Sequence, residues 1–418
     1  MSRKNIAIVG SGISGMACAH FLGRDHDITL FEKDNRIGGH SHTVMVDEGM
    51  IQIPVDTGFM VYNEVNYPLL TRLFRELEVK TKPTSMSFSV QQVADGLEYN
   101  GGSLNLLFGQ RRNLFHLRYW RMLMQINRFN RETVEELTNP KFGDITLRDY
   151  VQKRGYGEDF LKWYLSPMAA AVWSSPPERI EIFPARTLMR FWHNHGFLGL
   201  DTQHPWRTVD GGSRCYVEKL TAPYNQRIHV GAPISKVQGT TLWLEDGSES
   251  TYDQVVIAAH GDQALKLLAD PTPLERELLG KFTYQENVAL LHTDPQFMPK
   301  TRRCWASWNY RIDRNQRHST HYWMNELQGV SDHEQYFVSI NPPSPVAAEH
   351  VKRRLIYEHP LFDLEAVSAQ QYLPQLHQQG KETGRFFCGA WQRNGFHEDG
   401  LWSAVNVCAS VLGKDPWS

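Results

Sequence analysis

The sequence predicts an α/β fold in which a parallel sheet is assembled from separated stretches of the chain. Short apolar strand patterns at residues 5–9 and 27–32 flank a glycine-rich turn and a helical pattern at residues 16–22. This order is a β-α-β unit, which implies parallel strands joined by a right-handed crossover. Similar strand patterns return only late in the chain, after a long segment in which helical patterns dominate.

The later elements follow in chain order. Residues 66–200 are rich in helical pattern. Strands are then expected at 228–230, 241–245, 253–259 and 385–389, followed by a final helix at 399–412. The sheet domain should therefore be discontinuous, with residues 1–65, 205–265 and 380–418. A second domain should comprise residues 66–204 and 266–379.

Composition limits the classes of function. The 418 residues are 41% hydrophobic and 22% charged, which suits two globular domains, and a net charge of -2 gives no reason to expect nucleic acid. Five scattered cysteines without a C-x-x-C pair argue against disulfides and favour a reducing compartment. His193 and His195 lack a third ligand at a metal-binding spacing, so no metal site is expected. With no signal peptide pattern and no long apolar run, the chain is expected in the cytoplasm.

The glycine-rich turn has the spacing G-x-G-x-x-G. Gly10 permits a tight turn, Gly12 lets the backbone approach a pyrophosphate, and Gly15 allows close helix–strand packing. The phosphates would lie at the helix N-terminus, and Glu32 would accept hydrogen bonds from a ribose diol. The motif predicts a dinucleotide site. Its expected contacts are Gly10, Ser11, Gly12, Ile13, Ser14, Gly15, Glu32 and Lys33.

The next residues favour one class of dinucleotide. Arg36 to His40 (RIGGH) resembles the R-x-G-G stretch of FAD-binding proteins in the glutathione-reductase and amine-oxidase superfamily. By that resemblance, Arg36, Gly38, Gly39 and His40 would add contacts to the pyrophosphate. A second G-x-G-x-x-G, which NAD(P)H-dependent flavoproteins usually have, is absent from the sequence. The electrons should therefore come from the substrate.

The C-terminal segment supports this interpretation. Gly389 to Trp391 and Gly395 to Ala404 resemble the second FAD motif of amine oxidases, in which a helix N-terminus points at the flavin. The sequence departs from that pattern where Asp399-Gly400 replaces Gly-Ala, and His40 replaces an arginine. Further cofactor contacts are expected at Thr57, Gly58, Val237, Gly389, Asp399, Gly400 and Leu401.

The whole chain resembles the flavin-containing amine oxidase superfamily. It is also similar to a bacterial group of amine-oxidase-like predicted NAD/FAD-binding proteins. The resemblance rests on residues 38–43, 55–63, 259–264, 291–294, 305–310 and 395–400. It implies a Rossmann-like, glutathione-reductase-type FAD-binding domain with an inserted α+β substrate domain, FAD as cofactor, and an FAD-dependent oxidoreductase.

The same resemblance indicates a class of substrate. Genes of the bacterial group often lie beside methyltransferases of the cyclopropane-fatty-acyl synthase type, which implies a functional link and a redox step on a modified fatty-acyl or phospholipid chain. Two alternatives stay open. One is oxidation of an amine, a polyene or a polycyclic compound. The other is a non-catalytic accessory protein that binds the flavin.

His397 and Glu398 are the first candidates for a catalytic base, because they lie in the C-terminal flavin motif. Both also have structural interpretations: a histidine bonded to backbone, and a carboxylate that caps the last helix. Asp56 to Gly58 resembles a D-x-G turn near the flavin, but could equally be a plain turn.

Other candidates have less specific signals. His40 and His42 would support cofactor binding rather than proton transfer, and His260 could approach the cofactor or be solvated. Three aromatic residues would line the substrate cavity, with core packing as the alternative: Trp305, Trp308 and Tyr310.

Residues 104–131 contain six arginines and no acidic residue. Positions 115, 119, 122, 123 and 126 share one face of a helix. A basic, aromatic, amphipathic helix of this kind can lie on an anionic membrane, so a peripheral contact with the inner membrane face is one interpretation. The other is that the apolar face packs into the substrate domain while the arginines stay solvated.

Overall fold

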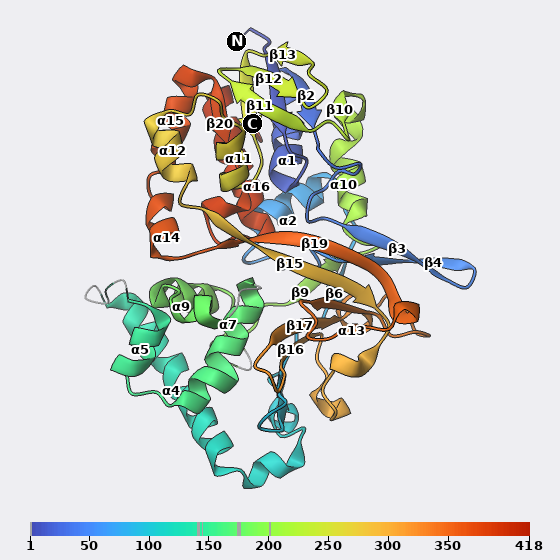
Figure 1. The fold of residues 1–418 in the computed structure, drawn as a ribbon, viewed down its shortest axis with the longest axis vertical. Coiled ribbons are helices and arrows are strands. Elements are labelled where there is room, and N and C mark those ends of the chain that lie inside the picture. The colour runs from blue at the N-terminus through green and yellow to red at the C-terminus, as the bar shows by residue number, and fades with distance from the viewer. Residues whose placement is uncertain (1, 140–142, 144, 174–176, 200–201) are drawn as a thin grey trace.

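The computed structural model describes residues 2–139, 143, 145–173, 177–199 and 202–418. Figure 1 shows two lobes: a five-stranded sheet covered by helices at the top, and a helical lobe beside a seven-stranded sheet below. Two long strands, β15 (Thr283–His292) and β19 (Val351–Leu361), cross the middle of the molecule between them. The predicted α/β fold with a second α+β unit is confirmed.

The five-stranded sheet draws its strands from nearly the whole chain. Its order is β10 (Ile228–His229), β2 (Asp27–Phe31), β1 (Asn5–Val9), β14 (Gln254–Ile257) and β20 (Arg385–Phe387), all parallel. All five were predicted to within a few residues. Parallel strands buried on both faces read as nearly continuous apolar runs, which explains why short patterns such as IAIV were sufficient to find them.

Successive residues of β1 enter different cores. Ile6 and Ile8 face a cluster that includes side chains of α1 and α16, whereas Ala7 and Val9 face a second cluster. The helices of the first face are α1 (Ile13–Leu22), α2 (Pro68–Glu76), α10 (Arg214–Thr221) and α16 (His397–Leu412). Those of the second are α11 (Gly261–Leu267), α12 (Pro273–Leu279), α14 (Leu364–Gln370) and α15 (Leu373–Thr383). A small sheet of β11 (Ile234–Gln238), β12 (Thr241–Leu244) and β13 (Glu249–Thr251) contributes to that second cluster through Ile234, Val237 and Leu242.

The seven-stranded sheet forms one wall of the lower lobe. Its order is β19, β15, β18 (Phe337–Ile340), β17 (His318–Trp323), β16 (Trp308–Ile312), β7 (Phe88–Gln92) and β8 (Leu97–Asn100). Two small sheets lie near the junction of the lobes: β3 (Thr43–Glu48) with β4 (Ile51–Asp56), and β5 (Tyr62–Asn63), β9 (Trp206–Val209) and β6 (Thr81–Thr84). The short helix α13 (Met324–Gln328) follows β17.

The helical lobe packs around aromatic side chains. It comprises α3 (Leu104–Leu107), the 3-10 turn η1 (Arg111–Phe115), α4 (Leu117–Thr138), α5 (Leu147–Lys153), α6 (Glu158–Phe160), η2 (Leu161–Leu165), α7 (Ser166–Trp173), α8 (Pro177–Glu181) and α9 (Ala185–Asn194). Phe129 of α4 is fully buried against Phe160 and Trp192. The remaining 3-10 turns are η3 (Ala222–Arg227), η4 (Pro295–Phe297), η5 (Arg302–Cys304), η6 (Ala348–His350) and η7 (Ala390–Gln392).

Several boundaries differ from the predicted ones. Helix α1 begins at Ile13 rather than Met16, and α16 at His397 rather than Asp399. In addition, α12, α14 and the first part of α15 pack on the five-stranded sheet although they lie in the segment 266–379 predicted for the second domain. Across the described residues, the structure contains no helix whose length and apolar character would suffice to span a membrane.

Candidate functional site

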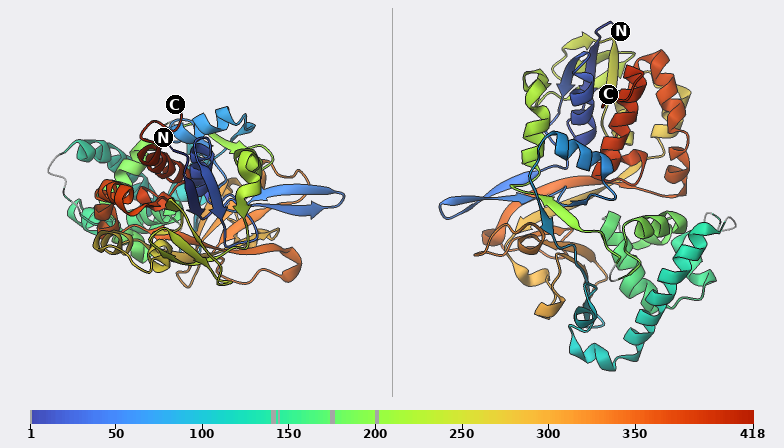
Figure 2. Two further views of the ribbon diagram at one scale, coloured as in Figure 1. Left: turned by 90° about the horizontal axis from the view of Figure 1, so that it is seen from above. Right: turned by 180° about the vertical axis from the view of Figure 1, so that it is seen from behind.

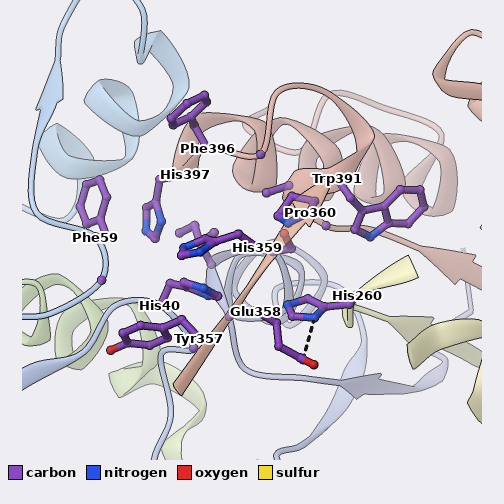
Figure 3. Close-up of a pocket in the computed structure, with 18 of the residues that line it drawn as sticks. His40, Phe59, His260, Tyr357, Glu358, His359, Pro360, Trp391, Phe396 and His397 are labelled. Carbon is purple, nitrogen blue, oxygen red and sulfur yellow. Dashed lines mark ion pairs between the residues drawn. The ribbon is translucent and has the colours of Figure 1, made fainter. Parts of the chain in front are cut away.

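A cavity of about 920 Å³ lies between the two lobes. One half is bounded by the carboxyl ends of the parallel strands, represented by Gly10, Glu32, Ala258 and Gly389. This is the position where open α/β sheets bind ligands. Strand β19 forms the boundary with the other half, and Figure 3 shows its residues Tyr357 to Pro360 beside His40 and His260.

The glycine loop has the backbone geometry that a pyrophosphate requires. Gly10 has a φ of +101°, which only glycine adopts without strain. A Cβ on Gly15 would lie 1.8 Å from the Gly10 carbonyl oxygen, so the start of α1 packs directly on the turn. A Cβ on Gly12 would meet no atom within 4 Å and would point into the cavity that Gly12 lines. That free space, at the N-terminus of α1, fits a phosphate group.

Glu32 is held at the end of β2 by the same loop. One of its oxygens accepts hydrogen bonds from the backbone N–H and the hydroxyl of Ser11 at 2.9 and 2.5 Å, and the other accepts from the Asp34 N–H at 2.9 Å. The carboxylate lines the cavity and retains lone pairs for a ribose diol. Glu32 thus lies directly after the second strand, where it was predicted, and its contact with a ribose stays a prediction.

The loop from Arg36 to His40 packs against the glycine turn. Gly38 donates its N–H to the Ser11 carbonyl at 3.0 Å, and a Cβ on Gly39 would lie 3.0 Å from the Gly12 Cα. Arg36 donates to the Gly39 carbonyl at 2.8 Å and also lines the cavity. Nε2 of His40 is buried at the cavity wall and has no hydrogen-bond partner in the described part of the chain. An unpaired polar atom here fits a bound polar group that the chain itself does not supply.

The C-terminal motif meets the N-terminal one. Ser14 donates a hydrogen bond to the Gly400 carbonyl at 2.9 Å, and a Cβ on Gly400 would lie 2.8 Å from a methyl carbon of Ile13. Asp399 accepts hydrogen bonds from the backbone of Asn394 and Phe396 and so caps α16. The two helix starts, α1 and α16, therefore lie side by side at the cavity.

The structure divides the predicted cofactor residues into two groups. Those that line the cavity are Gly10, Ser11, Gly12, Ile13, Ser14, Glu32, Lys33, Arg36, Gly39, His40, Gly58 and Gly389. Others support the wall from behind: Gly15, Gly38, Thr57, Asp399, Gly400 and Leu401. Asp56 belongs with this second group, because its buried carboxylate binds Ser213, Thr43 and Gln328.

The prediction for Val237 is wrong. Its side chain is fully buried in the second core, and its carbonyl accepts the Ala269 N–H at 2.9 Å. The neighbouring Ala232 and Ile234 line the cavity instead. Ile234 and Val237 both pack in the second core, and of the two only Ile234 also reaches the cavity.

Three histidines of the cavity wall are neutral at physiological pH. Burial lowers the pKa of His397 to about 3 and that of His359 to about 4, and burial together with His359 and His260 holds the pKa of His40 well below its ordinary value. His397 stacks on Phe59 at 3.9 Å and lies 2.6 Å from the Tyr216 hydroxyl. Figure 3 shows the rings of His40 and His359 next to each other and Phe59 beside His397.

Glu398 does not have the predicted position. Its carboxylate accepts the backbone N–H groups of Leu69 and Leu70, both at 2.9 Å, and so caps α2 rather than facing the cavity. The structural interpretation considered for Glu398 was that it caps the last helix, but it caps a different one. Helices α2 and α16 are more than 300 residues apart in sequence, so no local pattern predicts this contact. Of the two candidate bases, only His397 lines the cavity.

We expect Glu398→Gln to keep flavin reduction and to change the pH dependence of stability. Burial raises the pKa of Glu398 from 4.5 to about 7, so the folded protein binds this proton more tightly than the unfolded chain does. Its contribution to stability is therefore fully present below pH 4.5 and is lost as the pH rises to about 7, by about 3 kcal/mol. The difference between the urea unfolding midpoints on the acid and alkaline sides of this window should shrink in the variant.

Glu365→Gln is the matched control, because Glu365 is exposed and its pKa is lowered by Lys281. If Glu398→Gln binds FAD but its flavin is no longer reduced by substrate, Glu398 is the catalytic base after all.

The other half of the cavity is apolar. Its lining comes from the seven-stranded sheet, the helical lobe and nearby segments: Met60, Val61, Met86, Val172, Trp173, Phe191, His195, Phe197, Trp206, Trp308, Tyr322, Leu327, Ile356 and Phe396. Trp308 has its predicted place. Trp305 packs instead against Arg302 and Trp323, and the Tyr310 hydroxyl pairs with His318 at 3.0 Å, so neither is among the lining residues. Core or surface packing is the correct interpretation for these two.

The sequence offered no signal for several wall residues. Tyr357, Glu358 and His359 belong to a stretch of β19, residues 356–360, that lines the cavity without carrying a recognisable motif. His260 stacks on Tyr284 at 4.1 Å and pairs with Glu358 at 3.3 Å, so it approaches the cavity as one interpretation predicted. His42 lies beside the wall and pairs with the Tyr357 hydroxyl at 3.1 Å. The pairing of β19 with β15 places Tyr284, on which His260 stacks, opposite Pro360.

Known proteins share both the sequence pattern and the fold. The family model described as flavin containing amine oxidoreductase matches residues 13–331. Putrescine oxidase bound to putrescine is 12% identical, with 99% of this chain and 100% of that chain aligned and a TM-score of 0.65. The corresponding values are 13%, 96%, 97% and 0.66 for a CLA-producing fatty acid isomerase from P. acnes, and 13%, 98%, 100% and 0.65 for cyclohexylamine oxidase from Brevibacterium oxydans IH-35A. No curated protein sequence matches the chain.

Proposed function

We propose that this chain, which belongs to the family of flavin containing amine oxidoreductases, acts on a hydrophobic substrate such as a modified fatty-acyl or phospholipid chain. The chain is an FAD-dependent oxidoreductase with a Rossmann-like FAD domain and a substrate domain. The observation that carries the proposal is the apolar half of the cavity. Among the described residues of that lining, none is a lysine, arginine, aspartate or glutamate.

The residues of the cofactor half fit FAD. Gly12 and the start of α1 would hold the pyrophosphate, Glu32 the adenine ribose, and Arg36 and His40 the adjoining loop contacts. When bound, FAD supplies the acceptor for the hydride and proton that leave the substrate as a carbon–carbon double bond forms. The charged residues of the wall, Glu32, Lys33, Asp34, Arg36, Lys266 and Glu358, all lie in this half.

The apolar half determines which substrates can bind. An alkyl chain would exchange water for contacts with side chains such as Phe191, Trp308 and Ile356, at about 25 cal/mol for each Å² of apolar surface buried. A protonated amine would find no carboxylate among the described lining residues of this half to offset its desolvation. The neutral His195, whose pKa is lowered to about 4 by burial, adds no charge.

Two histidines at the boundary between the halves add no charge. His359 is fixed by a hydrogen-bonding contact of 2.8 Å to the Asn287 amide, and His397 by Tyr216. Because burial keeps both rings neutral, they would position the substrate through polar contacts and packing. Their low pKa values make them weak bases near neutral pH.

The substrate class is tested by anaerobic titration of the holoprotein. Detergent-dispersed phospholipid with methylated acyl chains, an alkyl diamine and a polyene should each be added while the visible absorbance of the oxidised flavin is recorded. We expect bleaching by the phospholipid and not by the amine. Bleaching by the amine alone would contradict the proposal and favour the amine alternative, and bleaching by the polyene alone would favour the polyene alternative.

A single substitution can separate the substrate half from the cofactor half. Met86→Asp places a carboxylate in the apolar half, and we expect it to slow reduction by the acyl substrate at least about tenfold, because a buried charge there has no partner. FAD content should stay at the wild-type level. Met50→Asp, at the exposed tip of the β3–β4 hairpin, is the matched control and should behave like the wild type. Equal rates in Met86→Asp and the wild type would show that the acyl chain does not occupy this half.

A further inference from the structure

We propose that the tip of the helical lobe is a docking surface for an anionic lipid bilayer. The surface comprises Leu104, Leu114, Phe115, Leu117, Trp120 and Met124, interspersed with arginines. It lies at the end of the molecule opposite the five-stranded sheet, where α3, η1 and the start of α4 form the lower tip in Figure 1. This inference goes beyond the proposed redox function and does not depend on it.

The exposed apolar side chains are concentrated at this tip. Of the fifteen large hydrophobic side chains exposed in the described part of the chain, six lie between residues 104 and 124. Phe115 and Leu117 are 89% and 85% exposed. Single exposed hydrophobic residues are ordinary, whereas a group of this kind indicates an interaction surface.

Helix α4 has two apolar faces. The face predicted from the sequence is largely buried, and the second face is exposed. Tyr119, Met122 and Phe129 are buried in the core of the lobe, so most of the predicted apolar face packs inward. Leu117, Trp120 and Met124 lie on the opposite side at helical spacing and remain exposed. Core packing therefore explains the first face but not the exposure of the second.

The tip is held in shape although its apolar groups are exposed. The Trp120 indole N–H donates to the Leu114 carbonyl at 2.9 Å, which ties η1 to α4. Arg111 donates to the carbonyls of Asn105 and Phe108 at 3.1 and 2.8 Å. These bonds fix the backbone in the free protein, so docking would require little further ordering of the chain and a small loss of conformational entropy.

The charge of the tip points to an anionic partner. Residues 104–131 contain six arginines and no acidic residue, although the whole protein has a net charge of -2. Arg118 and Arg128 pair with Asp159 and Glu132. The other four, Arg111, Arg112, Arg121 and Arg131, have no carboxylate partner in the described part of the chain.

A bilayer suits this combination better than a second copy of the chain. Two identical tips facing each other would bring arginine against arginine, which opposes association. At a bilayer, arginines reach lipid phosphates while Trp120, Phe115 and Leu117 enter the interfacial region. The tip is the end of the lobe in Figure 1, and its side chains Phe115 and Leu117 are largely exposed, as insertion into a surface requires.

The test is cosedimentation of the holoprotein with vesicles. Phosphatidylcholine vesicles with and without phosphatidylglycerol should be compared at low and high salt. We expect binding to the anionic vesicles that weakens with salt. Phe115→Ser/Leu117→Ser and Arg121→Glu/Arg131→Glu should each lower it at least about tenfold, because all four side chains are exposed and touch the bilayer rather than the core. Met50→Ser/Ile51→Ser, the exposed pair at the β3–β4 tip, should bind like the wild type.

Three results would overturn the proposal. The wild type could fail to bind anionic vesicles, or the tip variants could bind as well as the wild type. The wild type could also be a dimer that does not bind vesicles while the tip variants are monomers, which would make the tip an interface between copies of the chain. Flavin reduction by detergent-dispersed substrate should be unchanged in the tip variants, so failure of vesicle binding and failure of the proposed redox function are distinguishable.

Discussion

Gly12→Ala should lose FAD while the apoprotein folds normally. The added Cβ meets no protein atom within 4 Å, and Gly12 has an ordinary φ of -65°. The methyl group would instead occupy the space that fits the pyrophosphate. Overpacking of this kind typically costs about 1–3 kcal/mol, so FAD affinity should fall roughly 5- to 150-fold. Flavin content after purification and FAD titration of the apoprotein measure the loss.

Gly15→Ala is the matched comparison and should fail in a different way. Its Cβ would lie 1.8 Å from a backbone oxygen of Gly10, so the start of α1 has to move away from the turn. We expect the apoprotein itself to lose about 3 kcal/mol or more of stability. If Gly12→Ala apoprotein unfolds as early as Gly15→Ala, or if it keeps wild-type FAD affinity, the assignment of the free space to the pyrophosphate is wrong.

Arg385→Met should destabilise the protein by about 3–5 kcal/mol, because it leaves a buried carboxylate without its cation. Arg385 and Glu275 are 3% and 1% exposed at their side chains, and two hydrogen bonds of 3.1 and 2.8 Å join them. The same guanidinium binds Asp270 at 2.6 Å. Because Glu275 also caps α12, the loss would loosen that helix from β20. Urea unfolding of the apoprotein measures the effect.

Two further variants test this explanation. Arg385→Met/Glu275→Gln removes the charge along with its partner and should recover much of the lost stability. Lys266→Met removes a lysine that is 74% exposed and pairs with Asp262 on α11, and it should change stability by no more than about 0.5 kcal/mol. Equal destabilisation by Lys266→Met and Arg385→Met would show that burial is not the cause.

The fold was predictable where local pattern and burial agree. The strands of the five-stranded sheet are short apolar runs beside turns, and the glycine loop fixes the start of α1 through φ and close packing. The ends of helices were less predictable, because a capping interaction such as that between Asp399 and Phe396 starts a helix before its first apolar residue. The positions of α12 and α14 depend on which sheet they pack against, which no local pattern specifies.

The candidate site was predictable in its cofactor half and much less so in its substrate half. Gly10 to Glu32 lie within one β-α-β unit, so their spacing in sequence nearly determines their spacing in space. Trp308 and Tyr322 are paired on neighbouring strands of the seven-stranded sheet, whereas Phe191 comes from α9, and any of many aromatic residues could have filled those places. Glu398 shows the same limit, since its partners Leu69 and Leu70 are set by tertiary packing.

The contact between Ser14 and Gly400 determines when the cofactor site can form during synthesis. These residues are separated by 386 positions, and β1 pairs on one side with a strand that is made only after residue 250. Contacts of such long range form slowly, and a chain growing from its N-terminus exposes the apolar edge of β1 until its neighbours emerge. The glycine loop would thus be complete early but have no closed pocket behind it. FAD could be retained only after nearly the whole chain has left the ribosome, which makes cofactor capture a late step in the maturation of this protein.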